Sequence, residues 1–180
     1  NMNILSTLDA EYIRLNLTLN NEKKVSWEEK DVFLCSGLNY LPFEIKIENP
    51  HLWWPNNSGH QPLYKVNCEM MVKNRQISYP QFDFGIRTIE LDTSRINDDR
   101  RDFKFKINGY DIFAKGANWV PSDPLYIRVD DDRLEKIIKE AADANMNILR
   151  IWGGAVYNRK SFYTLCDKYG LLVWQDFMFA

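Results

Sequence analysis

The stretch "DDRLEKIIKEAADANMNILRIW" (residues 131–152) combines the pattern of a helix with that of a strand. Its acidic residues come first, where the positive end of a helix dipole stabilises them. Four apolar residues then recur at helical spacing: Leu134, Ile137, Ile138 and Ala141. The run "NILRIW" (147–152) that closes the stretch is short and apolar, which is typical of a buried strand.

The alternation of strand and helix continues on both sides of this stretch. Upstream, "KGANWVPSD" (115–123) contains a short strand, and downstream "RKSFYTLCDKYG" (159–170) predicts a helix that Gly170 closes. The run "LLVWQDF" (171–177) predicts another buried strand. Strands that alternate with helices indicate a parallel sheet buried on both faces.

Two architectures contain such a sheet. A doubly wound sheet would need a glycine-rich phosphate loop after its first strand, but residues 115–123 contain one glycine and a tryptophan. A (β/α)8 TIM barrel, cut off after its third strand, fits better. The active site of a barrel lies at the carboxyl ends of its strands. Polar and aromatic residues gather at three such ends here: Asn118-Trp119, Arg150 to Gly153 and Trp174 to Asp176.

The first hundred residues follow a different pattern, with apolar residues at every second position. Four runs have it: "YIRLNLTL" (12–19), "FEIKIEN" (43–49), "YKVNCEMMV" (64–72) and "FGIRTIEL" (84–91). Such runs predict antiparallel strands with one buried face, and hence a β-sandwich. The polar stretch "RINDDRR" (95–101) marks a boundary, with the sandwich at 1–101 and a β/α domain at 102–180. Asn108-Gly109 predicts a type I′ hairpin turn near the start of the second domain.

Composition argues against several classes of function. The chain has 23 Lys and Arg against 25 Asp and Glu, with no basic block, so we expect no nucleic-acid partner. No apolar run approaches the roughly 20 residues that cross a bilayer, so we expect no membrane partner. The cysteines Cys35, Cys68 and Cys166 are widely spaced, which suits neither a disulfide framework nor a metal site.

Four long motifs occur in order along the chain: "NPHLWWPNNSGHQPLY" (49–64), "FKINGYDIFAKGANWVPSD" (105–123), "NMNILRIWGGAVY" (145–157) and "FYTLCDKYGLLVWQDFMFA" (162–180). With them the chain resembles glycoside hydrolase family 2 from about Asn49 onward, and within that family the β-mannosidases most closely. The β-galactosidases and glucuronidases of the family carry His-Tyr-Pro where this chain has Trp152-Gly153-Gly154. They also end the third barrel strand in Asp-Glu, where this chain has Gln175-Asp176.

The resemblance implies an immunoglobulin-like sandwich followed by the N-terminal part of the catalytic barrel of a retaining exo-hydrolase. Such an enzyme removes terminal β-linked mannose with two carboxyl groups that lie about 5–5.5 Å apart. In the family both are Glu, on the fourth and seventh barrel strands, and neither is expected here, nor is the family's N-terminal jelly-roll domain. We therefore expect no catalytic residue in this chain and no activity from it alone. The resemblance implies no cofactor and no metal, and a β-linked mannoside as the substrate of the parent enzyme.

Two other readings of the function stay open. An endo-β-mannosidase or an exo-β-glucosaminidase shares the sandwich motifs, and a free-standing carbohydrate-binding β-module is the alternative outside the enzymes. The long motifs after residue 103 favour an enzyme, because a binding module does not need them. "WGGAVY" and "QDFMFA" favour the exo-mannosidase. The compartment of the parent protein, whether periplasmic, secreted or lysosomal, is left open.

The resemblance also assigns the site residues. Trp174 corresponds to the tryptophan that lines the pocket for the terminal mannose, and Arg150 to the arginine beside the nucleophile. Trp152 and Asn118 lie at strand ends and are expected to border the pocket, while Asp176 is expected behind the residues that touch the sugar.

Three further expectations concern packing. Trp53-Trp54-Pro55 is expected to pack the sandwich against the barrel rather than to bind sugar, and Gly85-Ile86-Arg87 to make an interdomain contact. The third barrel strand, at 171–177, would expose an apolar edge, and exposed edges recruit other chains. We therefore expect self-association.

Overall fold

The computed structural model describes residues 2–6, 10–19, 23–42 and 44–180. By their backbone contacts these residues divide into two compact units. The first contains residues 1–50 and 64–84, and the second contains residues 51–63 and 85–180.

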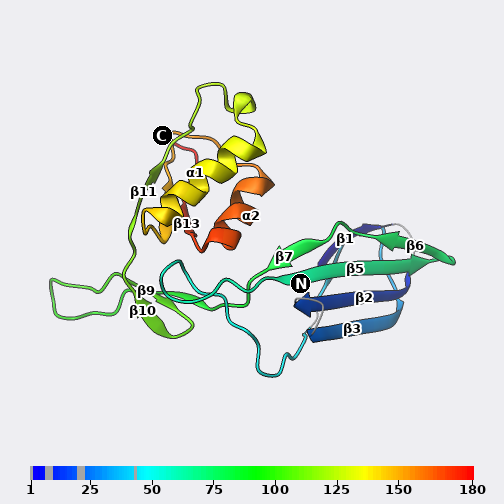
Figure 1. The fold of residues 1–180 in the computed structure, drawn as a ribbon. Coiled ribbons are helices and arrows are strands. Elements are labelled where there is room, and N and C mark those ends of the chain that lie inside the picture. The colour runs from blue at the N-terminus through cyan, green and yellow to red at the C-terminus, as the bar shows by residue number, and fades with distance from the viewer. Residues whose placement is uncertain (1, 7–9, 20–22, 43) are drawn as a thin grey trace. The chain divides into compact units, whose positions relative to one another are not determined.

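The first unit consists of antiparallel strands in two sheets (Figure 1). The larger sheet has the order β3-β2-β5-β6, and β7 also pairs with β5. Its strands are β2 (Ala10–Leu19), β3 (Lys23–Val32), β5 (Tyr64–Val72), β6 (Arg75–Ser78) and β7 (Phe82–Phe84). The smaller sheet pairs β1 (Met2–Ser6) with β4 (Gly37–Leu41).

Apolar side chains fill the space between these sheets. Ile13, Val32, Met70 and Val72 of the larger sheet are buried together, and Leu41 of β4 packs against them. Alternate residues of β5, namely Cys68, Met70 and Val72, thus face one core together with Ile13 of β2, as the period of two in a strand requires. The predicted β-sandwich is confirmed.

The strand predicted at 43–49 is wrong over its described part. Residues 44–49 are not in a strand, and Phe43 lies outside the described residues. Ile45 and Ile47 are still half-buried between exposed neighbours. The alternation of apolar and polar residues in this run therefore reflects burial of every second side chain and not a strand. The run at 84–91 is likewise not one strand, because residues 85–88 are irregular.

The second unit begins its regular structure with three antiparallel strands in the order β10-β9-β8. They are β8 (Ile89–Asp92), β9 (Lys104–Ile107) and β10 (Tyr110–Ile112). Asn108 and Gly109 have φ values of 52° and 82°, so the predicted type I′ turn is confirmed.

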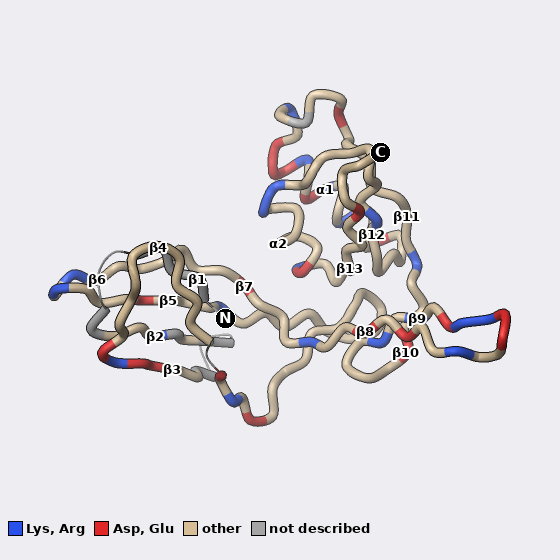
Figure 2. The backbone as a smooth tube through the Cα atoms, turned by 180° about the vertical axis from the view of Figure 1, so that it is seen from behind, with Lys and Arg blue, Asp and Glu red and all other residues tan. Residues whose placement is uncertain are grey.

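The stretch 95–101 is a hairpin loop within the second unit. It connects β8 to β9 and is closed by a bridge between Arg95 and Arg101. Figure 2 shows charges of both signs along this loop. The compact units therefore do not divide here, and the domain limits 1–101 and 102–180 stay predictions.

The rest of the second unit alternates strands and helices, as predicted. The elements are β11 (Gly116–Trp119), the 3-10 helix η1 (Tyr126–Arg128), α1 (Asp131–Asp143), β12 (Ile148–Ile151), α2 (Lys160–Tyr169) and β13 (Leu172–Gln175). The strands are parallel in the order β11-β12-β13. Asp130 caps α1 by accepting from the Arg133 amide, and Gly170, with φ 76°, ends α2.

Each face of this parallel sheet has its own covering. Trp119, Leu149 and Ile151 pack with the helices in a core that includes Ile138 and Phe162. On the opposite face, Ile148 and Leu172 pack with Trp53 and Ile107. That face is covered only in part, because Arg150 and Trp174 remain substantially exposed on it. The predicted burial of both faces is thus wrong at the carboxyl ends of the strands.

Asn147 fixes where the three parallel strands begin. It is buried, and its Oδ1 accepts from the Lys115 amide at 2.7 Å while its Nδ2 donates to the Phe113 oxygen at 2.9 Å. Its own main-chain oxygen accepts from the Leu172 amide at 2.8 Å. One residue thereby holds the starts of β11, β12 and β13 together, which sets the register further along.

Candidate functional site

Three predicted site residues form one row across the parallel sheet. Asn118 of β11 is paired with Arg150 of β12, and Arg150 with Trp174 of β13. Because paired residues of neighbouring strands point to the same face, these side chains lie side by side. The sequence alone placed them at three strand ends, and the register brings them together.

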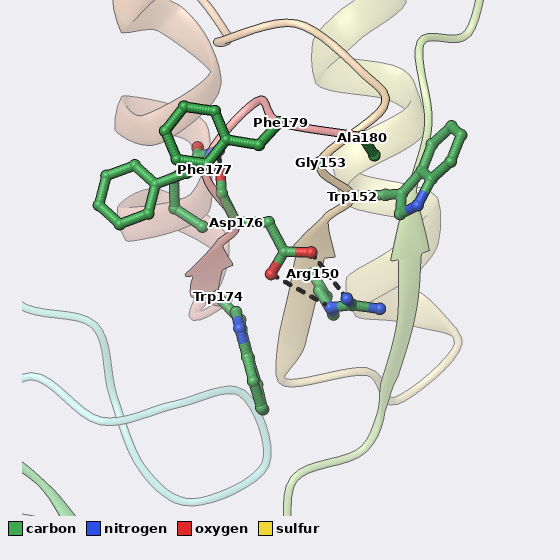
Figure 3. A pocket seen from close by; sticks show the side chains of 9 residues that line it. Arg150, Trp152, Gly153, Trp174, Asp176, Phe177, Phe179 and Ala180 are labelled. Atoms are coloured by element: carbon green, nitrogen blue, oxygen red, sulfur yellow. Dashed lines mark hydrogen bonds and ion pairs between the residues drawn. The ribbon is translucent and has the colours of Figure 1, made fainter.

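Asp176 joins this row from just beyond β13. Arg150 donates to it at two points, from Nη2 to Oδ2 at 2.7 Å and from Nε to Oδ1 at 3.3 Å (Figure 3). Arg150 also donates from Nη1 to Oδ1 of Asn118 at 3.3 Å. The planar guanidinium matches a carboxylate at two points, which fixes its orientation as well as its position.

Trp174 lies between this polar group and an apolar one. Its ring centre is 5.7 Å from that of Phe103 and 6.1 Å from that of Phe105, both on or next to β9. The Arg150 guanidinium carbon lies 6.0 Å from the centre of the Trp174 ring, at the outer limit of a cation–π contact. The side chain is held on one side and 40% exposed.

Two hollows of about 590 Å³ each share Arg150 and Trp174. The first opens at the carboxyl ends of the strands, and its further lining includes Trp152, Asp176, Phe177 and Phe179 (Figure 3). The second lies along the sheet towards β9 and is lined also by Phe103, Phe105, Ile112, Phe113 and Asn118. The first hollow has a charged floor and aromatic sides, whereas the second is mainly aromatic and aliphatic.

Close packing explains why glycine occupies both positions after Trp152 in Trp152-Gly153-Gly154. A Cβ on Gly154 would lie 2.4 Å from the Trp152 ring, and one on Gly153 would lie 2.7 Å from the Phe177 oxygen. The loops that follow β12 and β13 therefore lie against each other, and the Gly153 oxygen accepts from the Ala180 amide at 3.3 Å. This contact brings Trp152 to the mouth of the first hollow.

The comparisons with known proteins agree with this geometry. Residues 6–87 match the family model of glycosyl hydrolases family 2. Beta-mannosidase B of Emericella nidulans is 41% identical over 151 residues, which cover 84% of this chain and 18% of the relative. The beta-mannosidase of Capra hircus is 42% identical over 157 residues, which cover 85% of this chain and 18% of the relative. The chain belongs to glycosyl hydrolases family 2.

Solved structures extend the likeness of this family 2 chain to its fold. The crystal structure of beta-D-mannosidase from Dictyoglomus thermophilum matches with a TM-score of 0.80 and 34% identity, over 98% of this chain and 21% of that one. Parabacteroides merdae beta-glucuronidase matches with a TM-score of 0.72 at 20% identity, over 94% of this chain and 19% of that one, which shows a shared fold alone. This chain spans about a fifth of the length of these proteins.

The charged and aromatic groups of the first hollow suit a hydroxyl-rich ligand. Guanidinium and carboxylate groups supply donors and acceptors for hydroxyl groups, and aromatic faces pack against the C–H faces of sugars. A metal centre is not among the sites found, since no three His, Cys, Asp or Glu side chains lie together among the described residues. No helix in the described part of the chain is long and apolar enough to cross a membrane.

Trp53 and Arg87 pack inside the second unit. Trp53 is fully buried, and the Arg87 guanidinium lies 4.2 Å from the centre of its ring. Gly85 leaves room for both, because a Cβ there would lie 2.9 Å from the Trp53 ring. Trp53 thus packs within the second unit, and the expected contacts of Trp53-Trp54-Pro55 and of Gly85-Ile86-Arg87 with the sandwich stay predictions.

Sequence reasoning missed two residues behind the row. Gln175 accepts a hydrogen bond at its Oε1 from the Tyr163 hydroxyl of α2 at 2.9 Å. Its Nε2 donates to the main-chain oxygen of Asp176 at 2.7 Å. The sequence signal that could have identified Gln175 is its position as a polar residue at the end of an apolar strand. Its partner could not be named, because Tyr163 reads in the sequence only as one more half-buried position of a helix.

Proposed function

We propose that this chain forms part of a retaining exo-β-mannosidase, which hydrolyses terminal non-reducing β-D-mannose residues. One observation carries the proposal: Asn118, Arg150 and Trp174 form a single row at the open ends of three parallel strands, with Asp176 bound to Arg150. The beta-mannosidase relatives support the choice of sugar. The parallel β/α elements would be the first part of the (β/α)8 barrel that the resemblance implies.

Each residue of the row has a proposed role at the sugar. Trp174 provides an aromatic wall for the terminal mannose, and Trp152 and Asn118 border the pocket. Arg150 has five N–H donors, of which three are engaged with Asp176 and Asn118 in the structure. The remaining donors can meet a sugar hydroxyl or a neighbouring carboxylate.

Asp176 is proposed as a support rather than a catalytic group. Its carboxylate is bound at two points by Arg150, which holds it in position. Retention requires one carboxyl group as nucleophile and another as acid and base. We propose that both belong to parts of the longer protein that this chain does not contain, so that this chain alone is inactive.

Hydrolysis by the longer protein tests the proposal. We expect turnover of p-nitrophenyl β-D-mannoside, little of the corresponding β-glucuronide or β-glucosaminide, and release of β-mannose as the first anomer seen by NMR. Release of the α-anomer would contradict retention, and preference for another sugar would contradict the substrate. The 180-residue chain should give no turnover above the uncatalysed rate.

Trp174→Ala in the longer protein tests the row itself. We expect kcat/KM to fall about a hundredfold, or roughly 2.7 kcal/mol, if an aromatic wall of the pocket is lost. Phe33→Ala, which removes an exposed aromatic side chain from the first unit, is the matched control and should leave kcat/KM unchanged. Unchanged kcat/KM in Trp174→Ala, together with a lowered Tm, would make Trp174 a packing residue only.

A further inference from the structure

The Arg150–Asp176 ion pair is too exposed to hold the carboxylate in place by its own strength alone. The Arg150 side chain is 42% exposed and that of Asp176 is 21% exposed, and ion pairs so close to solvent contribute little to stability. Asp176 also lies one residue beyond the end of β13, which among the described residues pairs only with β12. Another part of the structure must hold the carboxylate against the guanidinium.

The main chain of Asp176 is held at both of its polar groups. Its amide donates to the Ile151 oxygen at 3.1 Å, which continues the strand ladder by one bond. Its oxygen accepts from Nε2 of Gln175 at 2.7 Å. On the side of β12, a Cβ on Gly153 would stand only 3.5 Å from the Asp176 Cβ, so the loop packs closely there.

Tyr163 holds the oxygen end of the Gln175 amide. Its hydroxyl donates to Oε1 at 2.9 Å, which leaves the amide nitrogen to face the Asp176 oxygen. The reversed amide would place two acceptors against each other at Asp176 and would present an N–H group to the Tyr163 hydroxyl. The main-chain oxygen of Asp176, which can only accept, therefore decides that the amide nitrogen faces it, and the hydroxyl on α2 holds the other end of the amide.

This arrangement connects the two faces of the sheet. Along β13, Trp174 faces the row with Arg150, so Gln175 points to the opposite face, where α2 lies. Asp176 then returns to the face of Arg150. The hydroxyl in the helical layer thus acts on the opposite face through one main-chain carbonyl.

We propose that Tyr163 and Gln175 are positioning residues for the Arg150–Asp176 pair. They hold the main chain of Asp176 where its carboxylate meets the guanidinium at two points. The inference rests on the proposed function only in placing this pair at a sugar site. The hydrogen bonds and their effect on the pair are independent of any reaction.

The test compares two hydroxyl deletions on the same helix. Tyr163→Phe removes the donor to Gln175, whereas Tyr169→Phe removes a hydroxyl that donates to Glu135, away from the row. The readout is the Arg150 Nε–H signal in the ¹⁵N NMR spectrum of the 180-residue chain, identified by its loss in Arg150→Lys. We expect exchange of this proton with water to become about fivefold faster or more in Tyr163→Phe, as for loss of one neutral hydrogen bond. Tyr169→Phe should leave it unchanged.

Several outcomes would overturn the proposal. Tyr163 would be reduced to a packing role if the Arg150 Nε–H proton exchanged equally fast in Tyr163→Phe and in the unsubstituted 180-residue chain, with a Tm lowered as much as in Tyr169→Phe. The proposal would also fail if this proton exchanged as fast in the unsubstituted chain as in Asp176→Asn, because the Arg150–Asp176 pair would then not be held. Gln175→Met should accelerate exchange at least as much as Tyr163→Phe. If that variant does not fold, Tyr163→Phe, which removes one oxygen atom, decides alone.

The result does not depend on the proposed hydrolysis. Faster exchange of the Arg150 Nε–H proton in Tyr163→Phe would support the positioning role even if the longer protein hydrolyses no mannoside. Conversely, an unchanged signal would leave the proposed activity untouched. In the longer protein, if both proposals hold, Tyr163→Phe should lower kcat/KM while Tyr169→Phe does not.

Discussion

The indole nitrogen of Trp53 donates a hydrogen bond of 2.7 Å to the main-chain oxygen of Asp167, although 114 residues separate the two in the sequence. The carboxylate of the same Asp167 accepts from Nη2 of Arg87 at 2.8 Å, and Arg87 lies over the Trp53 ring. Helix α2 is thereby bound at one residue by two segments that precede the β/α elements.

Trp53→Phe should lower the free energy of unfolding of the second unit by about 2 kcal/mol, because it leaves the part-buried carbonyl of Asp167 without its donor and a gap beside Arg87. Trp54→Phe is the control, since Trp54 is only half-buried and its ring contacts Tyr110 at 5.6 Å. Urea unfolding followed by circular dichroism measures both. Equal losses in the two variants would contradict a specific role for the Trp53 indole.

Two glycines with positive φ provide a matched pair of substitutions. Gly109 has φ 82° and no atom within 4 Å of a built Cβ, so Gly109→Ala should cost only the strain of the left-handed backbone, about 1 kcal/mol. Gly170 has φ 76°, but a Cβ there would lie 2.6 Å from the Asn56 nitrogen. Gly170→Ala should therefore cost clearly more. Thermal unfolding of both variants tests this, and equal losses would show that Asn56 moves aside freely.

The β/α elements could be predicted because each is specified locally. Helix α1 has its cap at Asp130 and its apolar stripe in the sequence, and Gly170 marks the end of α2. The strand predicted at 43–49 failed because pairing depends on a neighbour that no local pattern describes. The 95–101 stretch is polar, as a linker would be, and the pairing of β8 with β9 that closes it likewise depends on residues outside the stretch.

The candidate site could be predicted as a set of residues but not as a geometry. The resemblance and the strand ends pointed to Arg150, Trp174 and Asp176. Their mutual placement follows from register, which Asn147 sets through hydrogen bonds to segments more than 20 residues away. Single polar side chains that bond to distant segments leave no periodic pattern in the sequence. Neither the role of Asn147 nor the Tyr163–Gln175 hydrogen bond could therefore be recognised in advance.

Asp92 should make stability depend on pH below about 4, the usual value of an aspartate in an unfolded chain. A hydrogen bond from Lys106 at 2.9 Å, with a further one from the Ser94 amide, holds the pKa of Asp92 well below its usual range. A lowered pKa means that the contribution is complete above pH 4 and is lost as pH falls through the folded-state pKa. The urea midpoint should therefore decrease on acidification.

Asp92→Asn and Lys106→Met test whether this pair is responsible. Each should lower the urea midpoint at pH 6 and weaken its decrease towards pH 3, and the double variant should add little to either single one. The same bond raises the pKa of Lys106, so its contribution should also be lost at high pH, above the usual value of a lysine of about 10.4. Additive effects of the two substitutions would show that Asp92 and Lys106 act separately.

The edge of the parallel sheet gives a prediction about association. Among the described residues β13 pairs on one side only, with β12. Beyond it Phe177 and Phe179 are 73% and 90% exposed, and their rings stack at 5.8 Å between centres. An open strand edge beside exposed aromatic rings favours pairing with another chain. We therefore expect the 180-residue chain to sediment as concentration-dependent oligomers.

The variant with Phe177→Ser and Phe179→Ser separates this edge from other apolar surface. It should shift sedimentation towards the monomer, because the aromatic area beside β13 is lost while the backbone stays unchanged. Phe33→Ser is the control, since Phe33 is 83% exposed but belongs to the first unit. If the unsubstituted 180-residue chain were monomeric at high concentration, this would contradict association altogether. If Phe33→Ser shifted sedimentation as strongly as the double variant, contacts of the sandwich rather than the edge of β13 would drive association.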